Sequence, residues 1–475
     1  MRALLIIAAL AMIAMLSGVT ILETQQQQTA SGSTDSSSHS VQVTSMTISS
    51  TRASPALLTG SSSSSSPQSS ASTTTSTSSY SSVCQGTPNS TSTRRLVAQE
   101  NASNSKIAYA LIGGQSGRWF QQLQYPRLFN LSLSPSGSIN NLSSNIPGRG
   151  TVWGGGWNGT EWTISGWGTC DTPISSNPYI LHISANGSRY FGSLEQGQTE
   201  WTGGDIFSAS ANGSRWMLTG MDSGYIPLHS TRYPKLTLRS RTNHLSLGVT
   251  LGKNFVDYST ILPRKMDGVL FARQSNGTEW LTGGGWESTG VLFAFNGENF
   301  TDLTPLILKA VPSFHSVQTI AWNGKYWLIG GVGFLAKYQG STFTDLTPAL
   351  NRTLPLQEKL DNLTAVNSIA WNGSLWFLGG GYQIASPEET GSAWLASFDS
   401  SNFSDLTSHL PQRTLDSTTK NSSILSIAYA NGVWVIGGAV NNHGLLIEYR
   451  GGYFLDCSGM LGDTTYVDWV GALGS

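Results

Sequence analysis

From about residue 105 to the end of the chain, short apolar runs alternate with turn sequences in a repeating pattern. The repeat is clearest in residues 316–331, which read SVQTIAWNGKYWLIGG, and in residues 366–381, which read VNSIAWNGSLWFLGGG. In both, an Asn-Gly pair separates two apolar runs. Both residues of such a pair readily take positive φ, which predicts a tight β-hairpin. Two further apolar runs follow and meet at a glycine such as Gly340, so each unit predicts a four-stranded antiparallel meander.

The units recur every ~45 to 60 residues, a period typical of β-propeller blades. The first unit begins at its second strand, because IAYALIGG, which ends at Gly114, has no strand of the expected kind before it. Residues 464–473 resemble that missing strand and follow the last complete unit. Pairing of the two ends would remove two open sheet edges. We therefore predict an all-β fold, a seven-bladed β-propeller of four-stranded blades, closed by a C-terminal strand that completes the first blade.

A glycine doublet, a later Tyr or Phe, and an aromatic residue before a polar-Leu pair recur in the second half of the chain. These positions are Gly330, Gly331, Tyr338 and Phe343 in one unit, Gly379, Gly380, Phe398 and Phe403 in the next, and Gly437, Gly438, Tyr449 and Phe454 in the last. The pattern resembles the kelch repeat. Ser165-Gly166 and Thr219-Gly220 replace the doublet in two units, which indicates an outlying member of the kelch and galactose oxidase type of propeller. The resemblance implies a binding platform, with the copper enzyme galactose oxidase as a catalytic relative.

Residues 3–22 carry no charge and are almost wholly apolar. About 20 residues at 1.5 Å each match a hydrocarbon core of about 30 Å. We therefore predict an uncleaved transmembrane helix, a signal anchor, over residues 1–23; a signal peptide that is cleaved to release a secreted protein is the alternative. Arg2 before the segment and Glu23 after it place the rest of the chain outside the cell. The predicted location is the cell membrane, with a single pass and an extracellular propeller.

Residues 24–98 consist largely of Ser, Thr and Gln with too few apolar residues to form a core, which predicts a disordered stalk. Residues 99–475 are then the propeller. Acceptor sequences for N-glycosylation support an extracellular location, although Asn-Gly-Ser/Thr turns also create such sequences. They are Asn89, Asn101, Asn130, Asn141, Asn158, Asn186, Asn212, Asn276, Asn299, Asn351, Asn362, Asn372, Asn402 and Asn421.

Composition narrows the range of functions. Only 11% of the residues are charged and the formal net charge is -1, so the chain offers no basic surface for nucleic acid. Cys84, Cys170 and Cys457 form no CxxC pair. The closed ring would bring Cys84 near Cys457, and either a disulfide between them or two buried free thiols fits the sequence. The histidines show no metal-ligand spacing, so we predict no metal site and no cofactor.

Three sequence features that resemble functional motifs have structural explanations. Residues 154–159 fit the dinucleotide pattern GxGxxG, but they coincide with a hairpin turn and no βαβ unit follows. Asp302, Asp345 and Asp405 each precede Leu-Thr, and residues placed identically in successive blades are typical of local caps. The repeated tryptophans indicate packing between blades. No HExxH or GxSxG motif is present in the sequence.

The connections of a four-stranded meander lie on two faces of the ring. Turns between strands 1 and 2 and between strands 3 and 4 form one face, here the tight-turn face. Connections between strands 2 and 3 and between blades form the other, here the long-loop face, where binding sites are common. Cations and aromatic side chains on that face would suit an acidic glycan or carboxylates of a protein. The candidate ligand-binding residues are Trp119, Tyr125, Arg127, Tyr225, His229, Arg232, Tyr233, Arg239 and Arg241.

These features predict a membrane-anchored cell-surface propeller that binds a glycan or a protein partner on its long-loop face. An extracellular carbohydrate-active or oxidative enzyme, with a site at the mouth of the propeller, is the main alternative. A coat protein whose low charge limits repulsion in an acidic medium is a third hypothesis. The sequence contains no residue set that argues for catalysis, so we name no catalytic residue.

Overall fold

The computed structural model describes most of the chain from residue 109 to residue 472. The described residues are 109–117, 124–134, 137–146, 149–169, 177–184, 189–193, 204–222, 244–251, 254–264, 268–286, 289–355, 358–361, 363–382, 391–411, 414 and 422–472. All of them belong to one compact unit, Ser81–Ser475. The predicted membrane segment and stalk, residues 1–98, lie outside the described residues. Within the described part, the helices are too short or too polar to cross a bilayer.

The described strands form antiparallel four-stranded meanders. The first sheet has the spatial order β28 (Thr464–Ala472), β1 (Tyr109–Ser116), β2 (Tyr125–Ser132) and β3 (Ile139–Asn141). The second contains β4 (Arg149–Trp157), β5 (Glu161–Thr169), β6 (Asn177–Ser184) and β7 (Arg189–Ser193). The third contains β8 (Gly204–Asn212), β9 (Arg215–Asp222), β10 (His244–Leu251) and β11 (Asn254–Asp257). The fourth contains β12 (Val269–Ser275), β13 (Trp280–Trp286), β14 (Thr289–Phe295) and β15 (Phe300–Asp302).

The second half of the chain repeats this arrangement. The fifth meander contains β16 (Val317–Trp322), β17 (Trp327–Gly331), β18 (Phe334–Gln339) and β19 (Thr342–Asp345). Then follow β20 (Thr364–Trp371), β21 (Trp376–Tyr382), β22 (Trp394–Phe398) and β23 (Phe403–Asp405), and finally β24 (Ser422–Ala430), β25 (Val433–Val440), β26 (His443–Arg450) and β27 (Tyr453–Asp456). The last two meanders join into one eight-stranded sheet because Gly381 of β21 pairs with Ser423 of β24.

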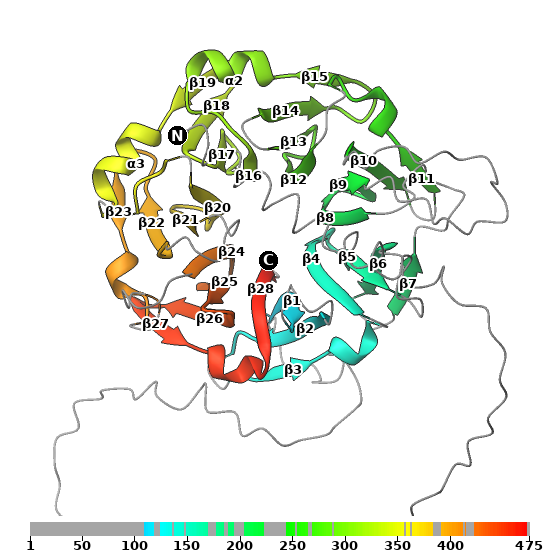
Figure 1. Cartoon of the computed structure of the whole chain (residues 1–475), viewed down its shortest axis with the longest axis vertical. Coiled ribbons are helices and arrows are strands. Elements are labelled where there is room, and N and C mark those ends of the chain that lie inside the picture. Colours follow the sequence, from blue (N-terminus) through cyan, green and yellow to red (C-terminus); the bar gives the residue numbers. More distant parts are fainter. Residues whose placement is uncertain are drawn as a thin grey trace, which may run out of the picture. The chain divides into compact units, whose positions relative to one another are not determined.

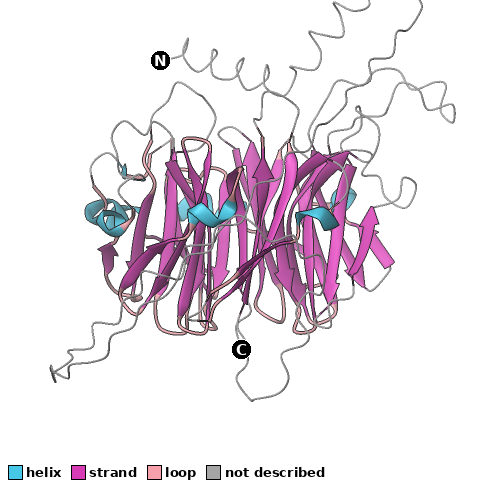
Figure 2. Ribbon diagram, turned by 90° about the horizontal axis from the view of Figure 1, so that it is seen from below, coloured by secondary structure: helices cyan, strands magenta, loops and turns pink. Residues whose placement is uncertain are grey.

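The fold is a β-propeller whose innermost strands surround a common axis (Figure 1). Each innermost strand contacts the next in the order β28, β4, β8, β12, β16, β20 and β24, and β24 contacts β28 in turn, so the contacts form a closed cycle. The predicted closure strand is confirmed: Val467 of β28 lies opposite Gly114 of β1, and Trp469 lies opposite Gly113. In side view the strands run between two faces that carry the turns (Figure 2).

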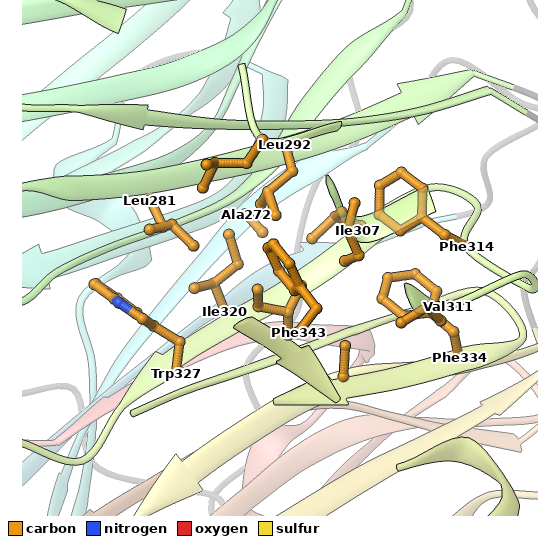
Figure 3. Packing of buried hydrophobic residues seen from close by; sticks show 14 of the residues in the cluster. Ala272, Leu281, Leu292, Ile307, Val311, Phe314, Ile320, Trp327, Phe334 and Phe343 are labelled. Atoms are coloured by element: carbon orange, nitrogen blue, oxygen red, sulfur yellow. The ribbon is translucent and has the colours of Figure 1, made fainter. Parts of the chain in front are cut away.

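The hydrophobic cores lie between adjacent sheets. One core joins Leu281 and Leu292 of the fourth sheet to Ile320 and Trp327 of the fifth. Two short helices follow outer strands, α2 (Thr304–Ala310) and α3 (Thr347–Thr353), and Ile307 of α2 enters the same core (Figure 3). Burying side chains of this size stabilises each interface by about 1.5–3 kcal/mol per residue.

The glycine doublet makes the sheets fit at these interfaces. A Cβ added to Gly379 would lie 2.5 Å from Cγ2 of Ile424 on the next innermost strand. A Cβ added to Gly380 would lie 1.9 Å from the carbonyl oxygen of Ala365 on the adjacent strand of its own sheet. The first glycine therefore permits packing between sheets, and the second permits pairing within a sheet.

The repeated Asp-Leu-Thr sequences act as local caps, as predicted. Asp345 Oδ1 accepts a hydrogen bond from the Thr347 N–H (2.9 Å), and Thr347 Oγ1 accepts one from the Leu335 N–H (3.0 Å). Asp302 with Thr304 and Asp405 with Thr407 make the same contacts. Because each carboxylate is used in this way, this row of Asp residues supports the outer strands.

Cys457 follows β27, is buried, and is disulfide-bonded. This excludes a free thiol at Cys457. The chain has two other cysteines, Cys84 and Cys170, and both lie outside the described residues. A bridge to Cys84 therefore stays a prediction.

Candidate ligand-binding site on the innermost strands

Most of the ligand-binding residues predicted from the sequence lie outside the described residues. They are Trp119, Tyr225, His229, Arg232, Tyr233, Arg239 and Arg241. The other two, Tyr125 and Arg127, lie at the start of β2, where the connection from β1 ends. Tyr125 is 46% exposed.

Arg127 already has an anionic partner. Its guanidinium contacts both carboxylate oxygens of Asp463, the residue that precedes β28. The Asp463 side chain is 73% exposed, so this ion pair lies at the surface, where such pairs contribute little stability. A ligand would have to compete with Asp463 for Arg127.

Every innermost strand carries a β-bulge at the same place. In β4, Val152 and Gly154 lie opposite consecutive residues of β5, which leaves Trp153 between them without a pairing partner. The other innermost strands have the same register shift against their neighbours. The bulged residues, here the inner ring, are Asp468, Trp153, Phe207, Phe271, Gln318, Asn367 and Leu425 in order around the axis.

Exposure distinguishes each inner-ring member from the residue before it. Each ring member is half-buried, and the residue before it is always a buried Val, Ile or Leu. That branched residue packs against the neighbouring sheet, as Val152 does against Gly113 and Ile424 against Gly379. A bulge re-aims a side chain and interrupts strand pairing, and bulges are frequent near functional sites.

Three consecutive ring members form an aromatic arc. The ring centroids of Trp153 and Phe207 are 5.3 Å apart with an interplanar angle of 36°. Those of Phe207 and Phe271 are also 5.3 Å apart, at 70°. Because the planes are inclined to one another, the arc offers ring faces and ring edges rather than one flat surface.

Polar ring members flank the aromatic arc on both sides. Asp468 precedes Trp153 in the ring, whereas Gln318 and then Asn367 follow Phe271. Asn367 Nδ2 donates to Ser423 Oγ (2.8 Å) and to the Ile424 carbonyl (3.1 Å). Gln318 Nε2 donates to Ser316 Oγ (3.2 Å). These contacts orient both amides, and no described residue donates to either amide oxygen.

Among the described residues, no hydrogen-bond partner is present for two buried polar atoms of the inner ring. They are Trp153 Nε1 and Asp468 Oδ2. A covered polar atom without a hydrogen bond costs about 1–3 kcal/mol. Burial also raises the pKa of Asp468 to about 8, so this carboxyl group is largely protonated and neutral at pH 7.

Arg273 lies two residues after Phe271 on β12 and reaches across two sheets. Its guanidinium donates to the carbonyl oxygen of Ala209 on β8 and to that of Gly155 on β4 (3.0 Å), while its Nε lacks a partner. Ala209 and Gly155 are small residues, which leaves space for the long Arg273 side chain. Burial lowers the pKa of Arg273, but a guanidinium stays protonated at neutral pH.

The described residues contain no group of three or more His, Cys, Asp or Glu side chains that could hold a metal ion. Burial also raises the pKa of Asp205, two residues before Phe207, to about 7. The arrangement at the innermost strands is suited to binding through aromatic faces and hydrogen bonds.

The inner ring was not predicted from the sequence, although the repeat contains a signal for it. When the units are aligned, the position before each member holds only Val, Ile or Leu. The ring position itself holds Trp, two Phe, Gln, Asn, Leu and Asp. A variable column beside an invariant apolar column marks a position that the repeat does not need for packing.

No protein family and no curated protein matches the chain by sequence. By structure it is similar to the β-propeller domain of the Trilobed protease from Pyrococcus furiosus, with 9% identity, a TM-score of 0.36, and coverage of 64% of this chain and 81% of that one. A putative 6-phosphogluconolactonase from Bacteroides uniformis gives 9% identity, a TM-score of 0.43, and coverage of 78% and 100%. The acylaminoacyl peptidase of Pyrococcus horikoshii gives 9% identity, a TM-score of 0.40, and coverage of 74% and 52%, so the chain spans about half of that protein. Identities this low concern the fold alone.

Proposed function

We propose that this protein is a membrane-anchored, cell-surface β-propeller that binds a glycan or a protein partner on its long-loop face. In this proposal the meanders count as seven kelch-like blades, residues 1–23 anchor the chain, and residues 24–98 hold the propeller away from the membrane. The protein binds its partner and does not transform it.

The observation that carries the proposal is the difference between the two faces. On the tight-turn face, side chains close the turns: Asn323 Oδ1 accepts hydrogen bonds from the N–H groups of Lys325 and Tyr326 (both 2.9 Å). Asn158, Asn276 and Asn372 close their turns in the same way. These backbone N–H groups are therefore already hydrogen-bonded within their turns, which leaves few donors for a ligand on this face.

On the long-loop face, the connections between second and third strands differ greatly in length. Two residues separate β25 from β26, whereas residues 223–243 separate β9 from β10. Variable connections on a rigid scaffold are the usual location of binding sites. The candidate residues Arg232, Tyr233 and Arg239 belong to the longest of these connections.

The test is a binding screen with the full-length protein in detergent micelles, against a glycan array and against solubilised surface proteins. Changing Arg232, Tyr233 and Arg239 together to Ala is expected to abolish the interaction. The matched control changes two cations and one aromatic residue on the tight-turn face, Arg215, Lys325 and Tyr453, which are all exposed, and should bind normally. Equal binding by both triple variants would refute the assignment of the face, and turnover of a bound glycan would favour the enzyme alternative.

A further inference from the structure

We propose that the inner ring binds one neutral sugar residue, with the C–H face of the sugar against the aromatic arc and its hydroxyl groups on Asp468, Gln318 and Asn367. This inference rests on the proposed function, because it names the ligand class and adds a second site on the same propeller. It uses described residues only.

The aromatic arc supplies the apolar half of the site. Trp153, Phe207 and Phe271 come from three consecutive sheets and contact one another, yet each stays half-buried. Each of these aromatic residues is more exposed than the residues on either side of it, which are buried. A pyranose ring offers a face of C–H groups that can cover such a surface, and burying apolar area of this kind stabilises a complex.

The flanking polar residues supply the other half. A sugar hydroxyl both donates and accepts a hydrogen bond, and so do amides and a protonated carboxyl group. Asp468 stands at one end of the arc and Gln318 at the other, so one ligand on the arc would lie between them. Bonding capacity remains at the amide oxygens of Gln318 and Asn367, which are half-buried and accept no hydrogen bond from the described residues. Trp153 Nε1 and Asp468 Oδ2 also lack a partner among the described residues, but both atoms are covered.

Charge decides between a sugar and an organic cation, which would also suit aromatic rings next to a carboxyl group. An ionised Asp468 would strengthen the binding of a cation, but burial raises the pKa of this group to about 8 and leaves it mostly neutral at pH 7. The nearest cationic group along β12, Arg273, directs its donors to backbone carbonyls and would repel a second cation. A neutral ligand with hydroxyl groups needs no ionised Asp468 and is not repelled by Arg273.

The experiment titrates the full-length protein in micelles at pH 7 with methyl glycosides of glucose, galactose and mannose. Saturation-transfer NMR measures contact between protein aromatic protons and sugar C–H groups, and calorimetry measures the Kd. At least one glycoside is expected to bind, and Trp153→Ala and Asp468→Ala should each weaken it about tenfold. The control, Leu425→Ala, removes the apolar ring member outside the arc and should change the Kd less than about twofold.

The outcomes separate this inference from the proposed function. If no glycoside binds the wild type, or if Trp153→Ala lowers the melting temperature without changing the Kd, the arc is only packing and the inference fails. If methylammonium binds and the glycosides do not, the ring is a cation site and the inference also fails.

Should Trp153→Ala not fold, Gln318→Ala gives the same test at a half-buried polar position. The Arg232, Tyr233 and Arg239 triple variant should keep glycoside binding at the inner ring. If it keeps this binding and also keeps the partner interaction of the wild type, the long-loop assignment is wrong while the inner-ring site stands.

Discussion

The two glycines of each doublet are not equally replaceable, because different neighbours limit them. Next to Gly379 is the side chain of Ile424, whose Cγ2 and Cβ would lie 2.5 and 3.0 Å from the added Cβ, so this side chain has to repack. Next to Gly380 is a backbone carbonyl that belongs to the strand ladder and cannot move without breaking it. The sequence reflects this: Ser165 and Thr219 replace the first glycine in two sheets, whereas Gly166 and Gly220 keep the second. The second glycine is therefore the stricter requirement for the fold.

This difference predicts an order of stabilities. Gly379→Ala is expected to lower the free energy of unfolding by about 1–3 kcal/mol, as overpacking does. Gly380→Ala should cost more, about 3 kcal/mol or above, because a backbone shift is needed. Gly459→Ala is the control, since its added Cβ would meet nothing within 4 Å, and it should be neutral. Urea unfolding measures all three, and equal effects of Gly379→Ala and Gly380→Ala would contradict the argument.

The acceptor sequences for N-glycosylation also differ residue by residue. Asn299 and Asn402 are exposed next to tight turns. Asn130 is buried in β2, and Asn351 is engaged at both ends of its amide, with Nδ2 donating to the Leu360 carbonyl (3.1 Å) and Oδ1 accepting from the Leu360 N–H (2.7 Å). We expect glycans on Asn299 and Asn402 and none on Asn130 and Asn351 after secretion from a eukaryotic host. Peptide mass spectrometry checks this, and an occupied Asn351 would show that glycosylation precedes folding there.

At the scale of the element, the repeat predicted the strands well and their local irregularities poorly. Asn431 and Gly432 both take positive φ (47° and 80°), as the Asn-Gly pattern predicted. In the corresponding turn at Asn323, only Gly324 has positive φ (89°). There the Asn323 side chain closes a longer turn by accepting hydrogen bonds from two backbone N–H groups. The bulges escaped prediction for a similar reason. A bulge adds one residue and so shifts the phase of the apolar alternation by one position, but innermost strands of six to nine residues are too short for period counting to show that shift.

The bulge of β28 makes a prediction about pH. Burial raises the pKa of Asp468 in the folded protein to about 8 from its ordinary value of 3.8, so the folded protein holds a proton that the unfolded chain releases between about pH 4 and pH 8. Stability therefore falls as the pH rises through this window, and Asp205, with a pKa of about 7, acts in the same direction. Tyr466 on the same strand titrates above the window, because burial and the Asp468 charge raise its pKa from 10.0.

Asp468→Asn should remove part of this slope. The variant is expected to melt at a temperature near that of the wild type at pH 5 and at a higher temperature at pH 8, since the neutral amide never ionises. Melting curves at both pH values measure the effect, with Glu298→Gln, which removes an exposed carboxylate, as the control. A variant that is less stable than the wild type at pH 8 would mean that the Asp468 charge is stabilising.

At the scale of the whole molecule, the ring depends on one strand from the end of the chain. β28 supplies the innermost strand of the first sheet, and Val467 also packs against Gly437 of the preceding sheet, where a Cβ would lie 2.4 Å from Val467 Cγ1. Trp469 of the same strand meets Trp162 of the following sheet, with centroids 5.8 Å apart. The strand thus joins three sheets, and it pairs with a sheet whose other strands, β1 to β3, come from the opposite end of the described residues.

Ending the chain at Asp463 is therefore expected to lower the melting temperature strongly and to promote association, because the edge of β1 and two apolar sheet faces lose their cover. Ending it at Ala472 removes only residues beyond β28 and should leave melting unchanged. A synthetic peptide of residues 464–475, added to the shorter chain, should restore part of the lost stability in proportion to its concentration, since a peptide that binds only the folded state stabilises it by mass action. Scanning calorimetry and light scattering measure both effects. Identical melting of the two truncated chains would mean that the remaining sheets hold the ring without the terminal strand.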